Sequence, residues 1–194
     1  LAPEAGDVGH YAGIFANAAE TILRKHEPAE VAPEFDVALR RNWPLAEVGF
    51  AVALDGQVFA PSPFAGPAAR QFRLENERFL CSRETLVVYW NSPKGAINLT
   101  EFDKKEFKAK SVPTEKGAEA DATGSRVAHV ETDFRQILAD ANEGVFARFL
   151  QDRLNVFFWY RSPDETNLVF GAQVNMSRLG ERLREAVRLD PSLG

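Results

Sequence analysis

The chain has 194 residues, of which 45% are apolar and 26% are charged, a composition that excludes a wholly disordered chain, a collagen and a coiled-coil rod. Its 23 basic and 28 acidic residues give a net charge of −5, which argues against nucleic acid as a partner because phosphate contacts need a cationic surplus. The single cysteine, Cys81, excludes an internal disulfide and a cysteine-rich metal site.

An amphipathic helix is predicted near the amino terminus, over residues 7–25. Apolar residues recur there at steps of three and four, and polar residues fill the other face. Pro28 ends this pattern, and a shorter helix is predicted over 33–41 because proline is well tolerated in a first helical turn.

The hydrophobic period then changes to two over residues 47–54, which predicts a strand with one buried face. Asp55-Gly56 separates this run from a second extended run at 57–60, an arrangement typical of a β-hairpin. Further along, residues 68–80 are predicted to form a helix. Residues 85–90 are predicted to form a strand because they are rich in β-branched and aromatic side chains.

Residues 101–126 form the segment least suited to a core. Six acidic and six basic residues fill it, with few apolar side chains between them. Such a segment cannot bury enough apolar surface to offset the entropy of ordering it. We therefore expect a charged excursion on the surface of the domain.

Helical periodicity returns after Thr132, which is predicted to cap a helix, whereas residues 145–150 fit a strand and a helix equally well. Residues 154–161 are apolar on both faces, which favours a central strand, and 167–175 are predicted as its return strand. A final helix is predicted over 177–189. Adjacent strands with intervening helices predict a single α+β domain over 1–194, with a central antiparallel sheet flanked by helices.

Motifs that would indicate catalysis are missing from the sequence. It has no glycine-rich phosphate loop, no Gly-x-Ser-x-Gly elbow and no His-Glu-x-x-His pair. Its three histidines are far apart and none has a second ligand at metal-binding spacing. The sequence therefore predicts no catalytic residue, no metal and no cofactor.

Aromatic side chains cluster on two of the predicted strands, at Tyr89-Trp90 and around Trp159. In a strand, Trp159 and Arg161 share a face, and an arginine beside an aromatic floor can bind a carboxylate. We therefore predict a ligand site lined by Tyr89, Trp90, Trp159 and Arg161. The alternative interpretation is that Trp159 belongs to the core and Arg161 is the exposed end of a strand.

Two parts of the sequence resemble a known family. A long amino-terminal helix followed by an Asp55-Gly56 hairpin resembles the opening of PAS-like extracytoplasmic sensor domains of the Cache type. The run Leu-Asn-Val-Phe-Phe-Trp-Tyr-Arg at 154–161, a turn, the strand at 168–174 and a helix are similar to the end of sensor regions in bacterial transmembrane histidine kinases.

The resemblance implies a PAS- or Cache-like fold with long terminal helices, located outside the cytoplasm between two membrane spans. The chain lacks an initiator Met, and we expect it to be a segment of such a protein. The domain would sense a small molecule or a periplasmic protein and transmit a conformational shift through its terminal helices, and a homodimer is expected through them. The kinase chemistry would lie outside this chain.

Two other functions remain open on the sequence alone. The first is a periplasmic or secreted small-molecule carrier, or a small enzyme, that uses the aromatic pocket. The second is a structural interaction domain without a ligand.

Overall fold

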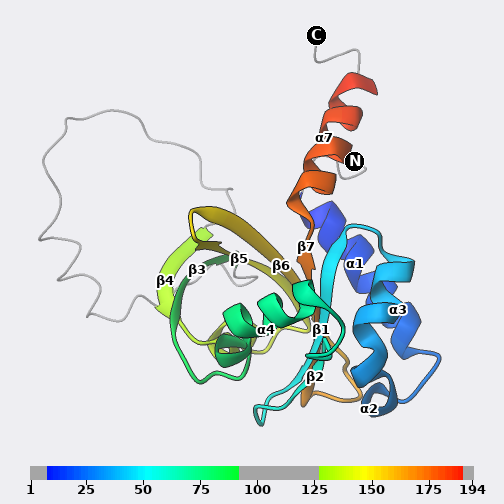
Figure 1. Ribbon diagram of the computed structural model, residues 1–194, viewed down its shortest axis with the longest axis vertical. Helices are drawn as coiled ribbons and strands as arrows, with labels where there is room; N and C mark the ends of the chain where they lie inside the picture. Colours follow the sequence, from blue (N-terminus) through cyan, green and yellow to red (C-terminus); the bar gives the residue numbers. More distant parts are fainter. Residues whose placement is uncertain (1–7, 92–126, 190–194) are drawn as a thin grey trace, which may run out of the picture.

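The computed structural model describes residues 8–91 and 127–189 (Figure 1). The charged excursion predicted over 101–126 therefore lies wholly outside the described residues. Along the chain the elements are α1 (Val8–Leu23), α2 (Pro28–Val31), the 3-10 helix η1 (Ala32–Glu34), α3 (Phe35–Asn42), β1 (Ala46–Ala53), β2 (Val58–Ala60), α4 (Pro67–Leu80), β3 (Leu86–Asn91), β4 (Val127–Thr132), α6 (Phe134–Leu138), β5 (Glu143–Leu150), β6 (Arg153–Arg161), β7 (Leu168–Val174) and α7 (Met176–Leu189). No helix among these is long and apolar enough to cross a bilayer.

The strands in the described part of the chain form one seven-stranded sheet in the order β2-β1-β7-β6-β5-β3-β4, and every neighbouring pair is antiparallel. The predicted α+β class with a central antiparallel sheet is confirmed. Both predicted hairpins are present, since β1 pairs with β2 and β6 pairs with β7. Gly56, in the first hairpin, has a φ of +102°, which the missing side chain permits. The central position predicted for 154–161 is also confirmed, because β6 lies between β7 and β5.

Helices cover both faces of the sheet, and each face has its own apolar core. The α1 face carries α1, α2 and α3, whose apolar residues pack on β1, β6 and β7, and its largest side chains are Phe15, Phe35, Trp43, Phe158 and Phe170. The α4 face carries α4 and α6, and its largest side chains are Phe50, Phe72, Phe79, Phe134, Phe146, Phe157 and Trp159. Alternate residues of each central strand therefore contribute to different cores.

The strand predicted with one buried face over 47–54 is buried on both faces, so that part of the prediction was wrong. In β1, Val48, Phe50 and Val52 face α4, while Ala51 and Ala53 belong to the core on the α1 face. The residues on the α1 face are small because α3 approaches β1 closely. A side chain at Gly49 would come within 2.8 Å of the Asp36 Cα.

Two strands were not predicted. Residues 145–150, left open between strand and helix, form most of β5, and β4 precedes α6 where no strand was expected. The cap of α6 is Asp133 instead of Thr132. Its carboxylate accepts the Gln136 N–H, and the Gln136 side chain accepts the Asp133 N–H in return. The neighbouring Thr132 belongs to β4, so one residue separates the strand from the helix.

A buried carboxylate fastens α3 to β1. Asp36 is 4% exposed, and its Oδ1 accepts the backbone N–H of Gly49 at 2.7 Å. Arg40, one turn along α3, donates to both carboxylate oxygens at 3.0 and 2.7 Å. The carboxylate therefore pairs a strand N–H and a helix cation at the point where α3 touches the sheet.

We expect Asp36→Ala to lower the free energy of unfolding by about 2–4 kcal/mol, because the buried Gly49 N–H loses its acceptor. Asp36→Asn keeps an oxygen at the same position and should lose clearly less. Urea unfolding followed by circular dichroism measures both variants. Equal stability of the Ala variant and the unsubstituted chain would contradict this role.

Candidate functional site

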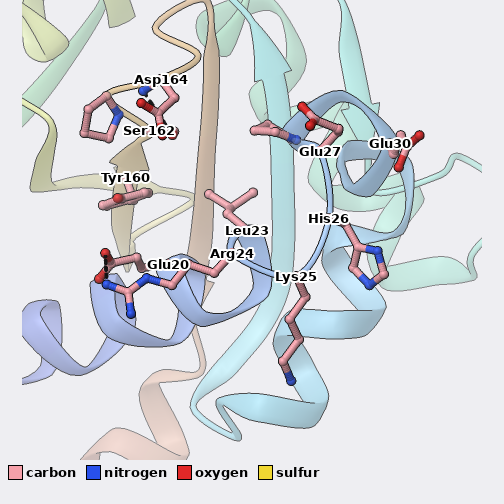
Figure 2. Close-up of a pocket in the computed structure, with 12 residues that line it drawn as sticks. Glu20, Leu23, Arg24, Lys25, His26, Glu27, Glu30, Tyr160, Ser162 and Asp164 are labelled. Carbon is pink, nitrogen blue, oxygen red and sulfur yellow. Dashed lines mark hydrogen bonds and ion pairs between the residues drawn. The ribbon is translucent and has the colours of Figure 1, made fainter.

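An open groove of about 810 Å³ lies on the α1 face of the sheet (Figure 2). It lies between the carboxyl-terminal end of α1, the loop that leads into α2, and the turn between β6 and β7. The lining residues are Glu20, Leu23, Arg24, Lys25, His26, Glu27, Pro28, Glu30, Tyr160, Ser162, Pro163 and Asp164.

Packing of α1 on β6 places these segments side by side. The rings of Phe15 and Phe158 lie 6.0 Å apart between the two elements. Tyr160 follows Phe158 by two residues on the same face of β6, so its ring lies beside the last turns of α1. The chain then turns at Ser162, whose Oγ accepts the Asp164 N–H at 3.4 Å. This bond orders the turn that forms one wall of the groove.

The groove is polar, and its acidic groups outnumber its basic ones. Four carboxylates line it, on Glu20, Glu27, Glu30 and Asp164, against the cations of Arg24 and Lys25. One of these cations is already paired, since Arg24 Nη2 lies 2.7 Å from Glu20 Oε1. The groove therefore favours a ligand with a positively charged group.

Tyr160 supplies the aromatic surface of the groove. It is half-buried, and burial raises the pKa of its hydroxyl, with the carboxylates of Glu20 and Glu143 acting in the same direction. The neutral hydroxyl can donate and accept hydrogen bonds above an apolar ring. Tyr160 and the four carboxylates of the groove together form a surface suited to binding an amine.

The predicted site residue Trp159 lies on the other face of the sheet. It is 2% exposed and packs in the core on the α4 face, where its indole covers Gly144. Successive strand residues point to opposite faces, so the groove receives Tyr160, its neighbour. Phe158 faces α1, and side chains two residues apart in a strand share a face, so this alternation could have identified Tyr160 as the residue beside α1.

Arg161 connects β6 to the loop between α6 and β5. Its Nη2 donates to the carbonyl oxygens of Ala139 and Ala141 at 3.3 and 2.8 Å, and its buried Nε has no hydrogen-bond partner among the described residues. Neither Arg161 nor Trp159 lines the groove.

Tyr89 and Trp90 lie in β3, opposite Ala147 and Phe146 of β5. Their side chains lie outside the described part of the structure. The backbone places them two strands from Trp159, since β5 lies between β3 and β6. The sequence did not predict the groove because eight of its twelve lining residues come from the helix end and loop at 20–30, which carries no recognisable motif.

Within residues 8–91 and 127–189, no group of three or more His, Cys, Asp or Glu side chains could hold a metal ion. Comparison with protein-family models, with curated proteins and with solved structures finds no match to this chain.

Proposed function

We propose that this chain is the extracytoplasmic sensing domain of a transmembrane signal-transduction histidine kinase. It binds a small molecule or a periplasmic protein and has no catalytic role of its own. Membrane spans on either side anchor the intact protein, and the kinase domain lies outside this chain. The family resemblance of the two hairpin regions supports this proposal.

The position of the groove on α1 carries the functional part of the proposal. Glu20, Leu23 and Arg24 in the last turns of α1 line the groove. The first turn of the same helix lies at the end of the molecule from which α7 extends (Figure 1). A ligand in the groove therefore touches one end of α1, and the other end of α1 lies where α7 extends from the molecule.

Signalling in this arrangement is a population shift. A ligand that binds one packing of α1 on the sheet more tightly than another shifts the equilibrium toward that packing. Among the described side chains of α7, only Leu179 is buried, and Arg178 Nη1 donates to the Pro44 carbonyl oxygen at 2.8 Å, so few contacts of these described residues oppose a change in the direction of the helix. A small shift of α1 can then alter the relative positions of the two helices.

The charge of the groove selects the ligand class. Three acidic side chains, Glu27, Glu30 and Asp164, line it in addition to the Glu20 that pairs with Arg24. An amine beside these carboxylates forms charge-assisted hydrogen bonds and can stack its alkyl chain on Tyr160. We therefore propose a ligand that bears at least one amino group.

Thermal unfolding of the purified chain tests this proposal, with ethanolamine, putrescine, spermidine and lysine as probes. An amine at about 100 times its dissociation constant should stabilise the chain by about 2.7 kcal/mol. Glu27→Gln combined with Asp164→Asn should weaken the affinity about tenfold or more, because two carboxylates of the groove are lost.

Asp152→Asn is the matched control, because it removes one carboxylate in the turn at the opposite end of β6. Its affinity for the amine should equal that of the unsubstituted chain. Absence of any amine response, or an equal response in the doubly substituted groove, would contradict the proposal.

A further inference from the structure

The last described helix, α7, is strongly amphipathic. One stripe along the helix, the α7 stripe, is apolar and consists of Met176, Leu179, Leu183, Ala186 and Val187. At about 100° of rotation per residue, Arg182 and Arg184 flank the α7 stripe on its two sides. Glu181 and Glu185 fall on the opposite side of the helix. Cations therefore border the apolar positions, and both acidic groups of α7 lie away from them.

The charge of α7 differs in sign from that of the chain. Its four arginines and two glutamates give the helix a net charge of +2, whereas the whole chain carries −5. Arg182 and Arg184 are exposed, and within residues 8–91 and 127–189 no carboxylate forms an ion pair with either of them. Both cations are therefore available to a negatively charged partner.

Most of α7 extends away from the body of the domain. Leu179 packs in the core on the α1 face and anchors the first turns of the helix, which then leaves the end of the sheet (Figure 1). Its 14 residues span about 21 Å, which exceeds two Debye lengths of about 8 Å at physiological salt. Acidic groups on the body of the domain are therefore largely screened from the far end of α7.

We propose that α7 lies on the surface of an anionic bilayer, with the α7 stripe at the boundary between headgroups and acyl chains. A strongly amphipathic helix of low overall hydrophobicity, with arginine on its polar side, is typical of helices that lie in this boundary. Arg182 and Arg184 reach the lipid phosphates while their alkyl stems cover apolar surface.

A second copy of α7 is a poorer occupant of the same surface. It brings an identical net charge of +2, so the two helices repel each other, whereas anionic headgroups attract the arginines. The inference is independent of the proposed sensor function, because binding to a bilayer surface requires neither the amine groove nor a membrane span.

Co-sedimentation of the purified chain with vesicles tests the proposal. Vesicles of phosphatidylglycerol and phosphatidylcholine in equal parts should bind the chain about tenfold or more tightly than vesicles of phosphatidylcholine alone, because only the former attract the arginines. Binding should weaken as salt rises to about 1 M, where the Debye length is about 3 Å. Equal binding to both kinds of vesicle, or no binding to either, would overturn the proposal.

Paired variants locate the binding surface. Arg182→Gln combined with Arg184→Gln should weaken binding to the anionic vesicles about tenfold or more, because two cations beside the surface are lost. Lys25→Gln combined with Arg78→Gln is the matched control. It removes the same charge from two exposed side chains at the other end of the sheet and should leave binding unchanged. Equal weakening in the two paired variants would overturn the proposal.

A fluorescent label reports which side of α7 meets the bilayer. Val187→Cys and Glu185→Cys, each in a Cys81→Ser background, attach an environment-sensitive dye at the α7 stripe and on the opposite side of the helix. Anionic vesicles should shift the emission at position 187 to the blue and leave that at 185 unchanged. Equal shifts would overturn the proposal. So would a dimer that forms without vesicles and shows no shift with them, because a second copy would then cover the α7 stripe.

Discussion

Trp159→Ala is expected to lower the free energy of unfolding by about 3–5 kcal/mol, the usual cost of emptying a large aromatic site in a core. The indole is 2% exposed, and it fills the space above Gly144, where an added Cβ would lie 2.8 Å from the ring. Urea unfolding followed by circular dichroism measures the loss.

Trp159→Phe is the matched variant for Trp159→Ala. It retains most of the apolar volume and removes the buried indole Nε1–H, which finds no acceptor within residues 8–91 and 127–189. We expect it to cost clearly less than the alanine substitution and to leave amine binding unchanged. Loss of amine binding in a stable Trp159→Phe variant would instead favour the sequence-based interpretation of Trp159 as a ligand residue.

Gly171→Ala is expected to destabilise the chain by about 3 kcal/mol or more, because the new methyl group has no space. Its Cβ would lie 2.0 Å from the Phe50 Cζ and 2.7 Å from the Phe158 carbonyl oxygen. The ring can move only by disturbing the core on the α4 face, and the carbonyl belongs to the neighbouring strand β6.

Gly13→Ala is the control for the same chemical change. Gly13 lies in α1 with no atom within 4 Å of the Cβ position, so alanine there should stabilise the chain by about 1 kcal/mol. Urea unfolding of the two variants should therefore show shifts of opposite sign. A tolerated Gly171→Ala would contradict the close packing of β7 against β1 and β6.

The hairpins were predictable because local chemistry determines them. Asp55-Gly56 favours a tight turn, and alternation on each side marks the strands. The pattern at 47–54 predicted only one buried face because Gly49, Ala51 and Ala53 are typical of a face exposed to solvent. In the structure these residues are small because α3 packs closely against them. Apolar periodicity reports which side chains are large but not whether a neighbour covers the small ones.

The missed strands have a different cause. β4 pairs with β3 across the long segment at 92–126, and nothing local to β4 signals a partner so distant in sequence. β5 was ambiguous because Arg148 interrupts its apolar face, and the structure shows that this cation is buried against α4. Tertiary contacts therefore determine that β4 and β5 are strands.

The candidate groove was the least predictable feature. Tyr160 is one residue from the predicted Trp159, and in a strand a shift of one residue reverses the face of the sheet. The groove's other wall comes from residues 20–30, where charged side chains are typical of any exposed helix end. Tertiary packing, such as that of Phe15 on Phe158, places these residues beside Tyr160.

The most direct test of the proposed sensor is a distance measurement between α1 and α7 with the groove empty and occupied. Spin labels at Gly13→Cys and Arg182→Cys, in a Cys81→Ser background, report this distance by double electron–electron resonance. The amine with the largest thermal shift serves as the probe. We predict that saturation with it shifts the distance distribution by about 1–2 Å or more, the scale of helix movements in signalling proteins. Superimposable distributions, measured while the thermal shift shows the groove to be occupied, would contradict coupling between the groove and the terminal helices.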